Sequence, residues 1–318
     1  MAPLPETPIW QRDSSHAQVL DYHLSMLLDT HRLDAFRRAI DAAVAPGDVV
    51  VDIGCGTGIL SFMACEAGAR RVYAIEGAPI LEVARELAVA NGFDEKIEFI
   101  EGWSIDVDLP EPADVLITET IGSAGLDEGI VAWAADARAR LLRPGAAVIP
   151  SRLRFWVAPV HMTDDHALIT DWLDTGLPYD LGPALRRAAH SLWFTRVVPD
   201  HLLGQPEPAL DVDLAAGDGD ALAASGTLEV THDGTIHGLA CWFDSLLAAG
   251  ITVDNSPPRT ESSWGHGFMP IQEPMAVHRG QVLRWSIEIS ADGHHWTWEV
   301  AAASAPTADS AGTSAPPA

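Results

Sequence analysis

The stretch VVVDIGCGTGIL, residues 49–60, decides the fold of this chain. A short apolar run leads through three glycines into a second apolar pattern, which predicts a buried strand, a tight turn and the start of a helix. The glycines let the backbone approach a ligand at the carboxyl edge of a sheet, where open α/β sheets bind ligands. The spacing is Gly-x-Gly-x-Gly, whereas the dinucleotide fingerprint is Gly-x-Gly-x-x-Gly, and this weakens the case for a nicotinamide cofactor.

The alternation of strand and helix continues after this stretch. Strand-like runs at residues 71–76, 96–102 and 113–120 alternate with amphipathic stretches that end near residues 67 and 90. This order predicts an α/β fold, a parallel sheet with crossover helices. Glu76 ends the second run, 24 residues after Asp52, where an acidic side chain accepts hydrogen bonds from both hydroxyls of a ribose. An adenosine-containing cofactor therefore fits this edge of the sheet.

The pattern changes after Pro150. Runs rich in Trp, Phe, Val and Thr, with turn residues between them, predict an antiparallel barrel or sandwich. The domains that we expect are a helical lead-in plus a Rossmann-like domain at residues 16–150, and a β-barrel domain at 151–300 with a helical arm at about 164–190. The ends, 1–15 and 301–318, are rich in proline and in polar or small residues, and we expect both to be disordered.

Charge and composition exclude several classes of function. The 318 residues hold 19 Lys and Arg against 45 Asp and Glu, a net charge of −26, so nucleic acid is an improbable partner and cationic ligands are favoured. We find neither an apolar stretch long enough to span a membrane nor the pattern of a signal peptide. Three scattered cysteines suit neither a disulfide framework nor a zinc site, so we expect a reducing cytoplasm.

Two carboxylates lie at or beyond the end of the fourth strand-like run. Glu119 lies at the end of this run, and Glu128 lies nine residues further on. Two carboxylates that face one small space raise each other's pKa unless a cation lies between them. A guanidinium is planar and has five donors, so two carboxylates can hold it at once. The pair predicts a site for a positively charged guest.

Residues 20–300 resemble the class I S-adenosylmethionine-dependent methyltransferases, and among them the protein arginine methyltransferases. The segment VVDIGCGTGILSFMACEAGARRVYAIE, from Val50 to Glu76, carries the cofactor motif of that family. The resemblance implies the following cofactor contacts: Asp52, Gly54 and Gly56 along the methionine portion, Glu76 on the ribose, Arg32 on the carboxylate, and Met26 beside the transferred methyl. The acidic residue that contacts adenine in the family falls at Ile105, so adenine is expected to be held differently, beside Ser104.

The same resemblance places the acceptor. Glu119 and Glu128 correspond to the paired glutamates of the family's substrate loop and are expected to be catalytic. Trp264, in the segment SSWGHGF at residues 262–268, matches the tryptophan of the family's Thr-His-Trp loop, and His23 lies in the segment that folds over the cofactor. We assign His23, Trp264 and His266 to substrate binding.

Two departures from the family gather around the acceptor. Ser263 stands where the loop has its histidine, so Asp29 is expected to lack its usual partner, with His266 as a candidate substitute. The aromatic residues of the family's N-terminal segment, which closes over the substrate arginine, fall at Asp13, Ser14 and Ala17. A differently built substrate pocket is implied.

The sequence leaves three functional hypotheses. The first is an S-adenosylmethionine-dependent enzyme that methylates a guanidino nitrogen of arginine, free or within a polypeptide, without a metal. The second moves the methyl group to an oxygen or amine of a natural product, with the two glutamates as general bases. The third is an acidic binding module without catalysis. The resemblance also implies that residues 164–183 form a helical arm that docks on a second subunit. The apolar positions of this segment need a partner surface, so we expect a head-to-tail homodimer.

Overall fold

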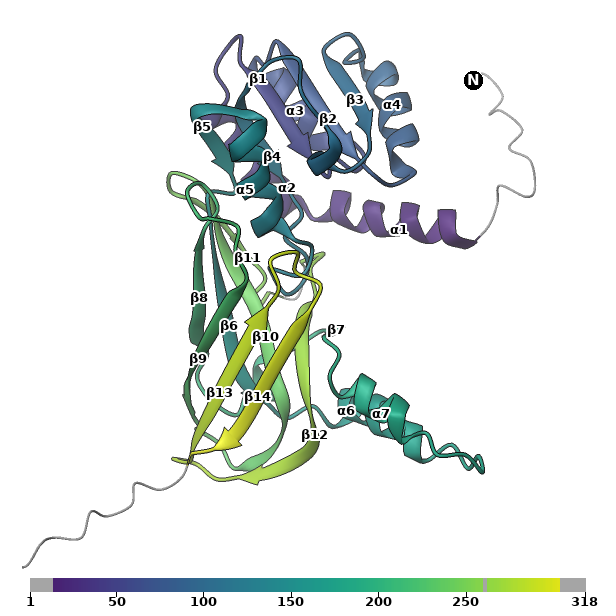
Figure 1. Ribbon diagram of the computed structural model, residues 1–318, viewed down its shortest axis with the longest axis vertical. Coiled ribbons are helices and arrows are strands. Elements are labelled where there is room, and N and C mark those ends of the chain that lie inside the picture. Colours follow the sequence, from purple (N-terminus) through teal and green to yellow (C-terminus); the bar gives the residue numbers. More distant parts are fainter. Residues whose placement is uncertain (1–13, 260–261, 304–318) are drawn as a thin grey trace, which may run out of the picture.

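The computed structural model describes residues 14–259 and 262–303. Figure 1 shows a parallel sheet with its helices at one end of an elongated molecule, strands of an antiparallel barrel at the other end, and a helical arm that projects sideways from the barrel. The α/β fold with a second β-barrel domain, predicted from the sequence, is confirmed. Within the described ranges, no helix is long and apolar enough to cross a membrane.

The helical lead-in consists of two helices. Helix α1 spans Ser14–Leu28, and α2 spans Thr30–Ala43. Asp29 separates them, because its carboxylate accepts a hydrogen bond from the backbone N–H of Arg32 at 3.0 Å and so caps the N-terminus of α2. Phe36 and Ile40 are fully buried, and they fix α2 against the core.

The sheet of the first domain has the strand order β3-β2-β1-β4-β5, and all neighbours are parallel. Its strands are β1 (Val49–Ile53), β2 (Arg71–Glu76), β3 (Ile97–Glu101), β4 (Ala113–Thr118) and β5 (Leu142–Ile149). The helices that follow them are α3 (Ile59–Ala67), α4 (Ile80–Asn91), η2 (Ser104–Asp106) and α5 (Ile130–Arg140). The chain order reverses between β1 and β4, and open α/β sheets bind ligands at the carboxyl ends of the strands at such a point.

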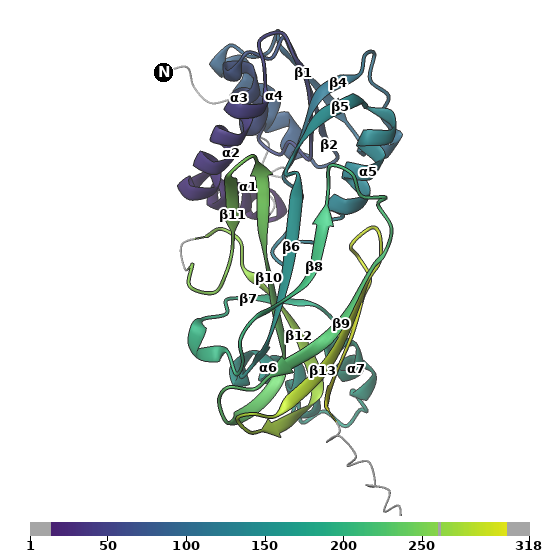
Figure 2. The ribbon, with the colours of Figure 1, turned by 90° about the vertical axis from the view of Figure 1, so that its left-hand side faces the viewer.

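The second domain is formed by two antiparallel sheets. One has the order β7-β12-β10-β6-β8, with β11 beside β10, and the other is β14-β13-β9. The sheets adjoin at β8 and β9 and at β12 and β14, so that they close into a barrel (Figure 2). The strands are β6 (Arg152–Val160), β7 (Trp193–Thr195), β8 (Glu207–Asp213), β9 (Leu222–Glu229), β10 (Gly234–Ala248), β11 (Ile251–Asp254), β12 (His266–Val277), β13 (Val282–Ile289) and β14 (Trp296–Ala302).

The arm contains α6 (Thr163–Thr170), η3 (Asp171–Leu173) and α7 (Gly182–Ala188), and η4 (Pro199–His201) follows β7. Its inner side chains, such as Ile169 and Leu185, pack on Trp242 and Phe268 of the barrel.

Two expected boundaries are shifted. Helix α1 begins at Ser14 and β14 ends at Ala302, so order extends slightly beyond both limits that composition indicated. Most of the two ends expected to be disordered, 1–13 and 304–318, lies outside the described residues.

Candidate active site

A cavity of about 390 Å³ lies at the carboxyl ends of the strands of the parallel sheet. Its wall is formed by α1, the glycine turn after β1, the ends of β2 and β3, the loop after β4, and two residues of the barrel domain, Trp264 and His294. Of the site residues predicted from the sequence, the cavity brings together His23, Met26, Arg32, Gly54, Gly56, Glu76, Ser104, Glu119, Glu128 and Trp264. Asp52 and His266 do not line it.

The glycine turn lets other parts of the chain come close to the backbone. Gly54 and Gly56 have φ of 70° and 53°, a region that favours glycine. A Cβ on Gly54 would lie 2.7 Å from Cγ2 of Thr120, and one on Gly56 would lie 3.0 Å from Cε1 of His23. Side chains at these two positions would therefore fill the space between the turn, α1 and the loop after β4.

Glu76 is held by two backbone groups. Its carboxylate oxygens accept hydrogen bonds from the N–H groups of Gly56 at 3.0 Å and Ala78 at 2.8 Å. Each carboxylate oxygen has a second lone pair, so the side chain can still accept from two hydroxyl groups of a ligand. Glu76 thus joins the glycine turn to the end of β2 and presents acceptors to the cavity.

Asp52 lies below the turn, and its expected place beside the cofactor is wrong. The side chain is fully buried and accepts a hydrogen bond from the Ser61 hydroxyl at 2.6 Å. Burial raises the pKa of Asp52 to about 7. The residue points from β1 to α3 because it anchors the helix that follows the turn, and it acts on the cavity only through that helix.

The part of the cavity beside β3 suits a flat heterocycle. Ser104 is buried there, and its hydroxyl has no hydrogen-bond partner among the described residues. The rings of Trp103 and Trp133 stack with centroids 6.0 Å apart, and Trp103 is 61% exposed. This part of the cavity therefore offers an unpaired hydroxyl and an accessible aromatic ring to a ligand.

Glu119 and Glu128 share the opposite part of the cavity. The Glu119 side chain is only 8% exposed, and burial raises its pKa against the opposing charge of Arg32. Desolvation by the cavity wall, together with the charges of Glu119 and Asp127, raises the pKa of Glu128 to about 8. Glu128 is the more accessible of the two, and the charge of Glu119 acts on it, as expected for two carboxylates that face one space.

The loop that carries both glutamates depends on close backbone packing. Gly122 has φ of 72°, and a Cβ there would collide with the Asp127 carboxylate, which accepts a hydrogen bond from the Ala124 N–H at 2.8 Å. On the outer side, a Cβ on Gly293, in the turn between β13 and β14, would collide with the Leu126 carbonyl. The loop is therefore fixed from within by Asp127 and from without by the barrel.

Comparisons with known proteins support this arrangement. A family model described as Ribosomal protein L11 methyltransferase (PrmA) matches residues 36–151. The chain is 31% identical to an Arginine N(omega)-methyltransferase from Streptomyces achromogenes subsp. streptozoticus, over 82% of this chain and 74% of that protein. It is also 31% identical to the Probable protein arginine N-methyltransferase 6 of Arabidopsis thaliana, over 84% of this chain and 72% of that protein. The chain belongs to the protein arginine methyltransferase family.

The fold agrees with that membership. A solved structure of a Trypanosoma brucei PRMT1 enzyme-prozyme heterotetrameric complex with AdoHcy superposes with a TM-score of 0.77 at 24% identity, covering 89% of this chain and 93% of that one. The family resemblance predicted for residues 20–300 is confirmed by the sequence matches, and the superposition shows that the fold of a sheet domain followed by a barrel is shared.

Within this arginine methyltransferase, Arg32 contacts Glu119 rather than standing free. Its guanidinium forms an ion pair with the Glu119 carboxylate and donates to the Met26 carbonyl at 3.2 Å. The guanidinium carbon lies 5.4 Å from the centre of a Trp264 ring, and Nε has no partner among the described residues. Arg32 therefore connects the cofactor segment to the acceptor loop, and its Nε is still available as a donor.

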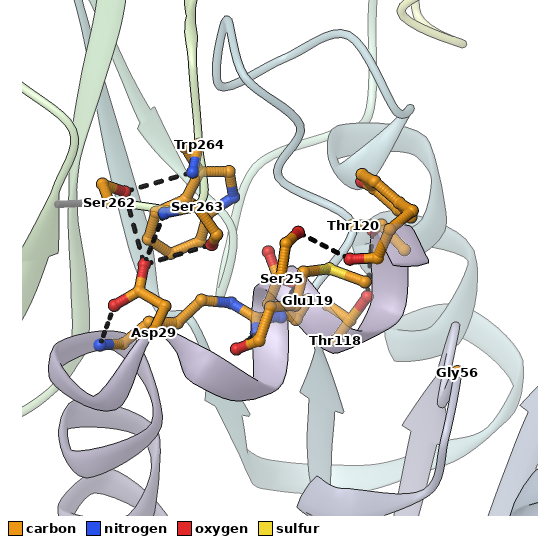
Figure 3. A network of polar contacts seen from close by, with 12 residues as sticks. Ser25, Asp29, Gly56, Thr118, Glu119, Thr120, Ser262, Ser263 and Trp264 are labelled. Atoms are coloured by element: carbon orange, nitrogen blue, oxygen red, sulfur yellow. Dashed lines mark hydrogen bonds and ion pairs between the residues drawn. The ribbon is translucent and has the colours of Figure 1, made fainter. Parts of the chain in front are cut away.

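Asp29 lacks the loop histidine, as expected from Ser263, but it has other hydrogen-bond partners. Its carboxylate accepts hydrogen bonds from the Ser263 N–H at 2.8 Å and the Ser263 hydroxyl at 3.1 Å, and it lies 3.4 Å from the Ser262 hydroxyl (Figure 3). Burial alone would raise the pKa of Asp29, but the hydrogen bonds from Ser263 and Arg32 lower it. Two serines thus do the work of the histidine that the family places in this loop.

His266 is not a substitute for that histidine, so its assignment to substrate binding is wrong. The ring is 1% exposed; Nδ1 accepts from the Val197 N–H at 2.9 Å, and Nε2 donates to the Asn255 carbonyl at 2.7 Å. Burial lowers the pKa of His266 to about 4, so the ring is a neutral structural bridge inside the barrel.

The cavity residues that sequence reasoning missed include aromatic and acidic side chains: Tyr22, Trp103, Asp127, Trp133 and His294. The signal for Trp103 was an aromatic residue directly after a strand, but Tyr22 and His294 give no local signal. Among the described residues, no group of three or more His, Cys, Asp or Glu side chains is arranged to hold a metal ion. The three thiols are free and buried.

Proposed function

We propose that this protein is an S-adenosylmethionine-dependent N-methyltransferase that acts on the guanidino group of arginine. The observation that carries the proposal is the shared cavity: Glu119 and Glu128 face the same space as the glycine turn and Glu76. Two carboxylates that share a cavity are stabilised by a cation between them, and a guanidinium is a cation whose donors match two carboxylates.

The cofactor-binding residues divide along the cavity. Glu76 accepts from the ribose hydroxyls, the backbone of Gly54 and Gly56 gives room to the methionine portion, and Ser104 with Trp103 holds adenine. When bound, S-adenosylmethionine supplies an electrophilic sulfonium methyl group. The free Nε of Arg32 is the donor left for a carboxylate.

The acceptor residues act through charge. Glu119 and Glu128 hold two nitrogens of the guanidinium and draw its positive charge toward themselves, which leaves the third nitrogen richer in electrons. Positioning of that nitrogen supplies much of the acceleration, and the preorganised carboxylates supply the rest. Glu128, with its high proton affinity, is the group that takes the proton from the product nitrogen.

A labelling experiment tests the activity. The protein is incubated with methyl-labelled S-adenosylmethionine and with free arginine, an arginine peptide, or an acceptor that has an amine or hydroxyl but no guanidine, and the products are identified by mass spectrometry. Label on a guanidino nitrogen, lost in Glu119→Gln and Glu128→Gln, supports the proposal. Label only on the guanidine-free acceptor favours the small-molecule alternative, and cofactor binding without any labelled product favours the binding module.

Two further expectations stay proposals. The arm exposes an apolar surface made of Leu168, Trp172, Leu173, Leu177 and Tyr179. This surface supports a head-to-tail homodimer. Light scattering should give twice the chain mass of 34.0 kDa, and a monomer at micromolar concentration would contradict the dimer. The free thiols support a reducing compartment such as the cytoplasm.

A further inference from the structure

Two successive residues of α1, Tyr22 and His23, serve different parts of the cavity. Successive side chains leave a helix about 100° apart, and here both line the cavity. The ring of His23 lies over Gly56, and the charges that act on it are those of Glu76 and Arg32. The strongest charge acting on Tyr22 is that of Glu128, followed by Glu119. His23 therefore faces the cofactor end, and Tyr22 faces the acceptor end.

The Tyr22 side chain is available to a ligand. It is 56% exposed, and among the described residues its hydroxyl has no hydrogen-bond partner. Its ring meets His23 edge to face, with centroids 5.7 Å apart and an interplanar angle of 71°, so the contact with His23 supports the orientation of the ring. Burial and the charges of both glutamates raise the pKa of Tyr22 to about 12, which keeps the phenol neutral.

We propose that Tyr22 forms the aromatic wall of the acceptor site, where its ring covers the guanidinium held by Glu119 and Glu128. This inference rests on the proposed function and names the residue that performs, from a different position on α1, the covering that Asp13, Ser14 and Ala17 cannot supply. A guanidinium stacks on an aromatic face, and the phenol oxygen can accept one of its N–H groups. The wall also explains why a large aromatic side chain is exposed at the mouth of an acidic cavity.

Steady-state kinetics with the guanidino acceptor that the wild-type enzyme methylates test this role. In Tyr22→Ala, the KM for the guanidino acceptor should rise about tenfold, because a partly desolvated cation–π contact contributes that much. The dissociation constant of S-adenosylhomocysteine should stay within about twofold. Tyr22→Phe keeps the ring and should show a rise of about threefold or less, which also covers the case in which the alanine variant does not fold. Leu20→Ala, an exposed position on the same helix that does not line the cavity, is the matched control.

Two outcomes would overturn the inference. An unchanged acceptor KM in Tyr22→Ala would show that the ring does not touch the acceptor. Parallel rises in acceptor KM and in the dissociation constant of S-adenosylhomocysteine would show that Tyr22 only closes α1 over the cofactor. Failure of the proposed function looks different, since the wild-type protein would then transfer no label to any guanidino acceptor.

Discussion

The two ends of the cavity are built in different ways. At the cofactor end, the glycine turn, Glu76 and Ser104 come from consecutive strands of one sheet, and the main contacts run to backbone groups. At the acceptor end, the loop after β4 is held by the barrel turn at Gly293 and by Arg32, while Tyr22 reaches in from α1. The first end is local in sequence, and the second is assembled from three distant segments.

This difference explains where the chain departs from its family. Backbone contacts at the cofactor end tolerate little change, because each glycine and Glu76 serves the turn itself as well as the ligand. Contacts at the acceptor end are made by side chains, and one side chain can replace another, as Ser263 does for the expected histidine beside Asp29. The acceptor end is thus the part of the site where substrate choice can change without loss of the cofactor.

The largest effect should come from removing a charge at the acceptor end. Glu119→Gln should lower kcat/KM by about 10²–10³, the usual loss when one preorganised electrostatic group is removed, while S-adenosylhomocysteine binding stays within about threefold. Isothermal titration and product assays measure the two quantities. Glu101→Gln, an exposed position at the end of β3, is the control. Equal losses of binding and turnover would show that the two ends are not separable.

The matching change at the cofactor end should have the reverse pattern. Glu76→Gln keeps one oxygen acceptor but puts an amide group near the N–H of Gly56 or Ala78. S-adenosylhomocysteine should bind about 10–100-fold more weakly, since hydrogen bonds to charged groups contribute about 1.5–3 kcal/mol each. Glu82→Gln on the exposed side of α4 should bind normally. Wild-type affinity in Glu76→Gln would remove this residue from the cofactor site.

The same contrast determines what the sequence can predict. Residues 49–60, the strand order around them and Glu76 follow from local pattern, because apolar periodicity and glycine spacing act within one unit of strand, turn and helix. Asp52 was misplaced because a pattern does not show whether a strand residue points above or below the turn. The serine partners of Asp29 lie more than 200 residues away, and the bridge at His266 reaches residues 11 and 69 positions distant. The position of Tyr22 in the cavity depends on the rotation of α1. No local signal encodes these contacts.

A pH titration should sharpen the description of the acceptor end. The guanidinium stays charged well above pH 9, so acceptor binding should follow ionisation of Glu128, whose pKa is about 8 in the free chain. Acceptor KM should fall as pH rises from 7 to 9, by at most about tenfold per unit below the pKa, and Glu128→Gln should abolish this slope. A KM that rises with pH over this range would contradict the assignment.

The raised pKa of Glu128 also determines how the stability of the protein changes with pH. The folded chain binds this proton more tightly than the unfolded chain, in which the pKa is about 4.5, so the contribution of Glu128 to the free energy of unfolding falls as pH rises from about 4.5 to 8. Glu128→Gln should therefore lose less thermal stability than the wild type over that range. An acceptor that binds Glu128 should raise the thermal stability of the wild type in this pH range and leave that of Glu128→Gln unchanged.

The smallest effect should come from the serine contact that replaces the family's histidine. Ser263→Ala removes one hydroxyl bond to Asp29 but leaves the backbone N–H at 2.8 Å, so the free energy of unfolding should fall by about 1 kcal/mol or less and kcat by less than about twofold. Ser262→Ala, which removes a longer contact, should cost less still. Asp29 caps the helix that carries Arg32. A large loss of turnover in Ser263→Ala would therefore mean that the barrel loop sets the position of Arg32. The two ends of the cavity would then be coupled through α2 rather than independent.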